Sequence, residues 1–342
     1  MPSCSTSLSF ACSATQERWL TALQRGLPLT PRPFETLARE LDCAEDELLS
    51  FVSQCRASGL VRRFGAVFDT RRLGYRSVLC AARIPSVELD AVAAKLVPLT
   101  GVTHCYVREP AGDMELSASL PNLWFTLSYP ADIFSAMADE VKARLAPYEV
   151  RLLPAMVRYK VDVVFGAATR AREESTADSL PVSAQDRIVI GALQGDTDVR
   201  SDYFAALAEQ VGLKEWHLLS TLELWRRNGR LKRIGLLLAH RTAGWTANGM
   251  CCWKIAGDTH DVGRVLAAQD EVTHCYERPE IPEFPYNLFA MVHARSIEEA
   301  QDQYRRLSDV VAATRADVAS SSVMLLSTKE YKKTSMTFFA GK

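Results

Sequence analysis

Apolar residues recur at helical spacing near the start of each half of this 342-residue chain. In the first half the spacing predicts helices over 34–41 and 45–57, with a short break between them. In the second half it predicts helices over 203–210 and 214–227. A glycine follows each helix pair, and a basic strand follows the glycine. Helix, turn, helix and strand is the order of a winged helix-turn-helix unit.

After each helix pair the pattern changes to short apolar runs bounded by turn residues, which indicates strands alternating with helices. A first strand is followed by the order βαββαβ, which is typical of a ferredoxin-like sheet with helices on one face. The second half has the same order, so the predicted fold class is α+β, as two tandem repeats. In the first half the expected strands are 62–68, 76–84, 102–108, 122–129 and 148–165, and the expected helices are 86–97 and 131–145.

Short matching segments confirm that the halves are related, although the first half has five more residues after its third strand. The matches are Arg63-Phe64-Gly65 with Arg233-Ile234-Gly235, Gly74-Tyr75 with Gly244-Trp245, Val102–Arg108 with Val272–Arg278, and Tyr159-Lys160 with Tyr331-Lys332. The expected domains are a flexible tail (1–15), helix-turn-helix units (16–61 and 185–231), sheet domains (62–166 and 232–342) and a polar linker (167–184).

Composition narrows the setting of the protein. Lys and Arg number 40 against 41 Asp and Glu, and this balance does not call for a nucleic-acid or membrane partner. Nine cysteines without CxxC spacing indicate free thiols in a reducing compartment. Residues 1–15 contain no Lys or Arg and no sustained apolar run, so we expect no secretory signal, and no stretch is long enough to span a bilayer. These features predict a cytoplasmic protein.

The repeated Val-Thr-His-Cys-Tyr-x-Arg motif carries the candidate chemistry. If it forms a strand, the His, Tyr and Arg side chains share one face, because alternate residues of a strand point the same way. The two rows are His104, Tyr106 and Arg108, and His274, Tyr276 and Arg278. Cys105 and Cys275 are then expected on the opposite face, packed against helices, which does not suit a His–Cys metal site.

These motifs together resemble the Lrp/AsnC family, whose members are DNA-binding regulators that dimerise through their sheet domains. Its siroheme decarboxylase branch resembles the chain more closely, through Arg62-Arg63-Phe64-Gly65-Ala66, Gly74-Tyr75 and the motif at 102–108. The second half departs to Lys232-Arg233-Ile234-Gly235-Leu236 and Gly244-Trp245 but keeps 272–278 in full. The resemblance covers residues 16–342 and looks like the fused two-subunit form used in heme d1 biosynthesis.

The resemblance implies a carboxy-lyase that removes CO2 from two acetate groups of siroheme to give didecarboxysiroheme, in heme d1 or an alternative heme biosynthesis. It implies no cofactor beyond the iron that the substrate carries. It also implies an intrachain pseudo-dimer, and leaves open a further oligomer or an association with neighbouring pathway enzymes. Siroheme carries eight carboxylates, so cations must position it. The candidates are Arg62, Arg63, Arg108, Lys232, Arg233 and Arg278; for 62–63 and 232–233 a solvated strand end is the alternative.

Under this resemblance His104 and His274 are the expected catalytic residues, and Tyr106 and Tyr276 assist by hydrogen bonding. A histidine is the natural proton donor near neutral pH. Either imidazole could instead be an axial ligand of the substrate iron, and the sequence does not separate the two roles. A purely structural role for each histidine is the remaining alternative.

Two other functions fit the same sequence: an Lrp/AsnC-type DNA-binding transcription regulator, and a non-enzymatic tetrapyrrole-binding sensor. A recognition helix needs donors for phosphates and base edges. The predicted helix over 45–57 opens with Glu45-Asp46-Glu47, and its one basic residue, Arg56, lies at the far end. An acidic first turn repels DNA, so we expect no specific DNA binding and a scaffolding role for the helix-turn-helix units.

Overall fold

The structure, a computed structural model, describes residues 12–112, 119–161, 179–239, 242, 244–315 and 319–339. Its helix-turn-helix units contain the predicted helices with bounds that differ by no more than one residue. An additional helix precedes each pair, and the first begins at Ala14, inside the predicted tail, because Ser13 and Gln16 form a capping box. The units are α1 (Ala14–Arg25), α2 (Pro33–Leu41) and α3 (Glu45–Ala57), and α7 (Ala184–Gln194), α8 (Tyr203–Gln210) and α9 (Glu215–Arg227).

The basic strands β1 (Val61–Phe68) and β7 (Leu231–Leu238) pair with each other as a two-stranded antiparallel ribbon, with Gly65 opposite Gly235. These glycines admit a helix end from the other half. A Cβ on Gly235 would lie 2.4 Å from the Leu23 carbonyl oxygen, and one on Gly65 would lie 2.4 Å from the Gly195 oxygen. The repeated glycine therefore lets the two helix-turn-helix units exchange their first helices across the ribbon.

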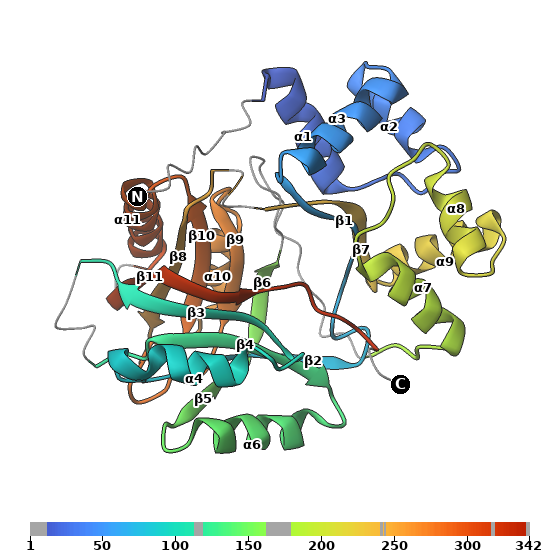
Figure 1. Cartoon of the computed structure of the whole chain (residues 1–342). Helices are drawn as coiled ribbons and strands as arrows, with labels where there is room; N and C mark the ends of the chain where they lie inside the picture. Colours follow the sequence, from blue (N-terminus) through green and yellow to red (C-terminus); the bar gives the residue numbers. More distant parts are fainter. Residues whose placement is uncertain are drawn as a thin grey trace, which may run out of the picture.

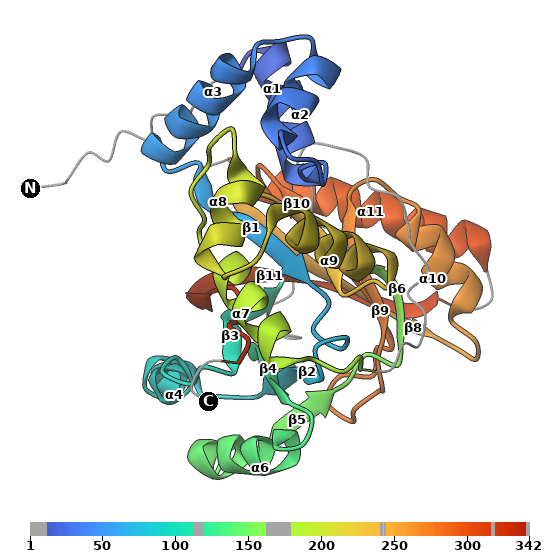
Figure 2. The same cartoon turned by 90° about the vertical axis from the view of Figure 1, so that its right-hand side faces the viewer.

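A nine-stranded sheet with helices packed against it forms the rest of the described structure, with the strands in the order β5-β2-β4-β3-β11-β8-β10-β9-β6. Figures 1 and 2 show α4 and α6 against one part of it and α10 and α11 against the other. The first-half elements are β2 (Tyr75–Ala82), η1 (Ser86–Glu88), α4 (Leu89–Leu96), β3 (Val102–Pro110), β4 (Leu123–Pro130), α6 (Phe134–Leu145), β5 (Val150–Leu153) and β6 (Val157–Val161). The second-half elements are β8 (Ala247–Ile255), α10 (His260–Ala267), β9 (Val272–Glu277), β10 (Leu288–Ala294), α11 (Ile297–Thr314) and β11 (Ala319–Lys333).

The predicted single strand over 148–165 is wrong. It is two strands, β5 beside β2 in its own half and β6 beside β9 in the other half. Pro154 follows β5 directly, and proline lacks the N–H that a ladder needs. The corresponding strand of the second half, β11, is continuous and pairs first with β8 and then with β3. Residues 162–165 of the predicted strand, and most of the predicted linker, lie outside the described residues.

Each half therefore completes the sheet of the other half with its last strand. Lysines at matching positions hold the exchange, because the buried Lys160 ammonium donates to the Gln269 carbonyl and the partly buried Lys332 ammonium donates to the Val97 and Leu99 carbonyls. A shared core, containing Trp124 and Phe289 among others, lies where the two half-sheets face each other. Within the described part of the chain, no helix is long and apolar enough to cross a membrane.

Candidate active site

The two copies of the motif form β3 and β9, and each row of side chains lies on one face as predicted. The rings of His104 and Tyr106 lie 6.2 Å apart, and those of His274 and Tyr276 lie 6.0 Å apart. An arginine continues each row over the tyrosine ring, with its guanidinium carbon 5.4 Å from the ring centre in the first copy and 4.7 Å in the second. The intervening cysteines are fully buried against the helices, which confirms that prediction.

Neighbouring threonines orient both imidazoles. Thr103 Oγ1 lies 2.9 Å from Nδ1 of His104, and Thr273 Oγ1 lies 3.2 Å from Nδ1 of His274. Thr273 also donates its hydroxyl proton to the Met291 carbonyl oxygen at 3.1 Å. Thr273 Oγ1 also lies 3.3 Å from Nδ1 of His293. With its one proton in the Met291 bond, the hydroxyl can only accept from the two imidazoles, and Nε2 of His274 then keeps its lone pair. The structure leaves the tautomer of His104 open.

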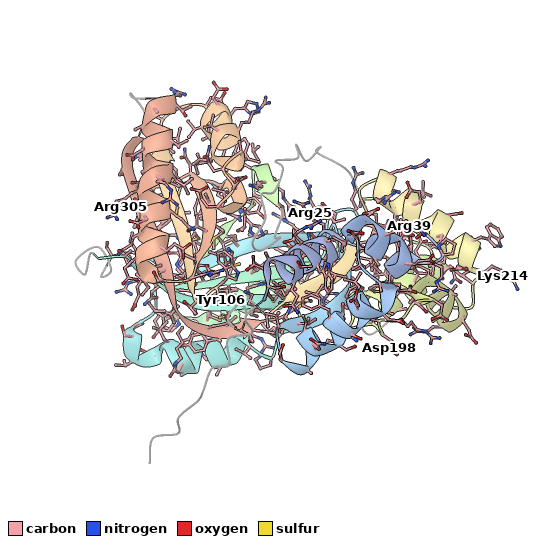
Figure 3. The ribbon with its side chains drawn as sticks, turned by 90° about the horizontal axis from the view of Figure 1, so that it is seen from above. Arg25, Arg39, Tyr106, Asp198, Lys214 and Arg305 are labelled. Carbon is pink, nitrogen blue, oxygen red and sulfur yellow. The ribbon has the colours of Figure 1, made fainter. Side chains whose placement is uncertain are left out.

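The two rows come together, because His274 lies close enough to His104 to contribute to its pKa; Figure 3 labels Tyr106 of the first row. Burial lowers the pKa of His104 to about 3, and Lys333, Arg62, His274 and Arg108 lower it further. Burial likewise lowers the pKa of His274 to about 4, with further contributions from nearby cations that include Lys333. Both imidazoles are therefore neutral near pH 7 in the free protein.

The cations expected on the β1–β7 ribbon have different surroundings. Arg62 and Lys232 occupy matching positions, and their charges lower the pKa of His104 and His274, respectively. Arg62 also donates to Ser335, and Lys232 lies 3.8 Å from the Asp69 carboxylate. In contrast, Arg63 donates to Ser335 and to the carbonyl oxygens of Gly195 and Ala66, and so ties the ribbon to its surroundings. Arg233 lies close enough to Arg63 to lower its pKa, although burial contributes most to that shift.

The two motif arginines are buried and bind backbone of the opposite half. Arg108 donates to the Leu325 carbonyl oxygen at 3.4 Å and to Asn248 Oδ1 at 3.0 Å. Arg278 donates to the Leu153 carbonyl oxygen at 2.5 Å. Leu325 lies in the exchanged strand β11, and Leu153 is the matching position at the end of β5, so each arginine ties its motif strand to backbone of the opposite half. Arg278 Nε has no hydrogen-bond partner among the described residues, and substrate binding by these arginines stays a prediction.

Two further cations reach the histidines and were missed from the sequence. Arg158 is the ladder partner of Tyr276, and Lys333 is the ladder partner of His104. Each comes from the half opposite to the motif that it faces, which no local pattern indicates. The repeated Tyr-Lys pairs at 159–160 and 331–332 were the available signal, because they lie beside these cations. We call His104, His274, Arg62, Lys232, Arg158 and Lys333 the histidine cluster.

Comparison with known proteins places the chain in a class and then in a family. The AsnC-like ligand binding domain matches residues 72–160 and 242–332, so the fold is a fused pair of AsnC-type units. The siroheme decarboxylase NirDL-like HTH domain matches residues 17–62. A siroheme decarboxylase from Hydrogenobacter thermophilus is 31% identical over 332 residues, which covers 95% of each chain. The chain belongs to the siroheme decarboxylase family.

Other relatives agree with this placement. The siroheme decarboxylase NirDL subunit of Paracoccus denitrificans is 31% identical over 83% of this chain and 86% of its own. A crystal structure of the siroheme decarboxylase NirDL has a TM-score of 0.70 at 28% identity, covering 95% of this chain and 94% of that chain. A second NirDL structure, in co-complex with an iron-uroporphyrin III analogue, has a TM-score of 0.68 at 28% identity, covering 94% and 93%. The expected α+β fold with two AsnC-type units is therefore confirmed.

Proposed function

We propose that this protein is a carboxy-lyase that removes CO2 from two acetate side chains of siroheme and releases didecarboxysiroheme. The observation that carries the proposal is that both His-Tyr rows meet among cations at the strand exchange. A substrate with eight carboxylates requires such cations, and arginine suits carboxylates because it binds them through two parallel hydrogen bonds. The names of the relatives and the tetrapyrrole analogue bound to NirDL support the same substrate class.

Each decarboxylation breaks the bond between the acetate methylene and its carboxylate. The electron pair stays on the tetrapyrrole, CO2 leaves, and a proton then adds to the methylene carbon to make a methyl group. Each turn therefore consumes one proton, which a histidine supplies. The histidines are neutral in the free protein, but the carboxylates of a bound substrate would offset Arg62, Lys232 and Lys333 and so raise the pKa of both imidazoles.

The threonine contacts favour different roles for the two histidines. The Nε2 lone pair of His274 suits an axial ligand of the substrate iron, because iron-binding histidines usually donate their other N–H to a fixed acceptor. His104, for which neither tautomer is imposed, then serves as the proton donor. Tyr106 and Tyr276 lie next to these rings and would contact the same substrate.

Strictly anaerobic incubation with siroheme, followed by mass analysis, tests the proposal. The expected product is lighter by two CO2, and it forms without nicotinamide, flavin or S-adenosylmethionine. A monodecarboxylated species should appear transiently, because two acetates cannot occupy one proton donor together. Siroheme that binds, with a shift in its visible spectrum, but is recovered unchanged would refute the proposal and favour a tetrapyrrole sensor.

A further inference from the structure

The histidine cluster is built from the two related halves of the chain, but matching positions in the two halves carry different charges. The ladders of β6 with β9 and of β11 with β3 have the same register and the same irregularity, so their positions correspond one to one. Tyr276 faces Arg158, whereas Tyr106 faces Glu330. The two tyrosines therefore have partners of opposite charge.

A second pair of matching positions differs in the same ladders. His104 faces Lys333, whereas His274 faces Val161. Lys333 lowers the pKa of both imidazoles, so its charge is shared by the two halves of the cluster. His104, His274, Lys333 and Val161 are each partly exposed.

Acidic residues complete the contrast. On the Tyr106 side of the cluster, the Glu330 carboxylate favours the charged form of Arg62. On the Tyr276 side of the cluster, Asp69 pairs with Lys232, and Arg158 also lowers the pKa of Asp69. With Lys333 left out because it is shared, the surroundings of Tyr276 contain the cations Lys232, Arg278 and Arg158 and the carboxylate of Asp69, which Arg71 also pairs. The surroundings of Tyr106 contain the cations Arg62 and Arg108 and the carboxylate of Glu330.

We propose that Arg158 and Glu330 determine the orientation in which the tetrapyrrole binds, and hence which acetate loses CO2 first. Arg158 holds a carboxylate of the substrate that is not decarboxylated, and Glu330 repels carboxylates from the opposite tyrosine. Lys333 binds a carboxylate between the two histidines in either orientation. A related pair of half-sites would otherwise accept the substrate in two orientations. This inference rests on the proposed function and adds the order of the two decarboxylations to it.

The test is the identity of the transient monodecarboxylated product. Anaerobic reactions with siroheme are quenched before completion, the monodecarboxylated isomers are separated by chromatography, and the position of the new methyl group is assigned by NMR. Wild-type protein is expected to give one predominant isomer. The double variant Arg158→Glu/Glu330→Arg keeps the net charge and is expected to shift the isomer ratio at least about tenfold toward the other isomer, which corresponds to about 1.4 kcal/mol.

A charge-reversal control and a second pair of variants keep the result decisive. Arg305→Glu reverses an exposed charge on α11, at the edge of the molecule in Figure 3, and should leave the isomer ratio unchanged. If the double variant does not fold, the single variants Arg158→Gln and Glu330→Gln are expected to move the ratio in the same direction. An unchanged ratio in active variants overturns the inference alone. Absence of any decarboxylation by wild-type protein overturns the proposed function and this inference with it.

Discussion

Acidification should destabilise this protein through its two cluster histidines. The pKa of His104 is about 3 and that of His274 about 4 in the folded protein, against 6.5 for an ordinary histidine. At pH values between these folded pKa values and 6.5, the unfolded chain therefore binds more protons than the folded protein. The free energy of unfolding has its full value above pH 6.5 and decreases as the pH falls toward the pKa values of the folded protein.

The size of the effect follows from the same shifts. Between about pH 7 and about pH 5 each histidine should lower the free energy of unfolding by about 2 kcal/mol, and the two together by about 4 kcal/mol. Lysine and arginine keep their charge throughout this range. The carboxylate of Asp69, whose pKa is lowered by Lys232, Arg71 and Arg158 despite its burial, titrates only below it.

Urea-induced unfolding, followed by tryptophan fluorescence at both pH values, measures this loss. The double variant His104→Gln/His274→Gln is the matched control, because glutamine is polar and does not titrate. We expect the wild-type protein to lose about 4 kcal/mol more than the variant on acidification. Equal losses in the two proteins would refute the reasoning, because they would mean that the imidazoles are already hydrated and free to protonate.

Three further predictions follow from the same geometry. His104→Ala should lower the rate of siroheme decarboxylation at least about a hundredfold, whereas His274→Ala should also change the visible spectrum of bound siroheme; equal rate losses with unchanged spectra would indicate two independent sites. Gly235→Ala should lower the free energy of unfolding by about 1–3 kcal/mol, because its Cβ would meet the Leu23 oxygen, whereas Gly191→Ala in open space should not; a harmless Gly235→Ala would show that α1 does not dock there. A gel-shift titration with the gene's own upstream DNA should show no specific binding, because α3, the predicted recognition helix, has an acidic first turn that repels DNA. Saturable nanomolar binding in the presence of competitor DNA would instead favour a transcription regulator.

Local patterns in the sequence were sufficient for the helices, the repeat and the direction of the motif side chains. Helical spacing and turn residues act within a few positions, which is why the predicted bounds of α2, α3, α8 and α9 differ from the structure by no more than one residue. Strand alternation likewise placed His104 and Tyr106 on one face and Cys105 on the other, whatever the partner strand was.

Only the tertiary structure decided which strands pair, and this pairing determines the composition of the histidine cluster. Pairing between distant strands has no local signature, so the split at Pro154 and the exchange of β6 and β11 were not predicted. The exchange brings Arg158 and Lys333 to histidines of the opposite half. It also gives Arg108 a backbone partner in that half, a contact that residue type alone could not distinguish from a carboxylate of the substrate.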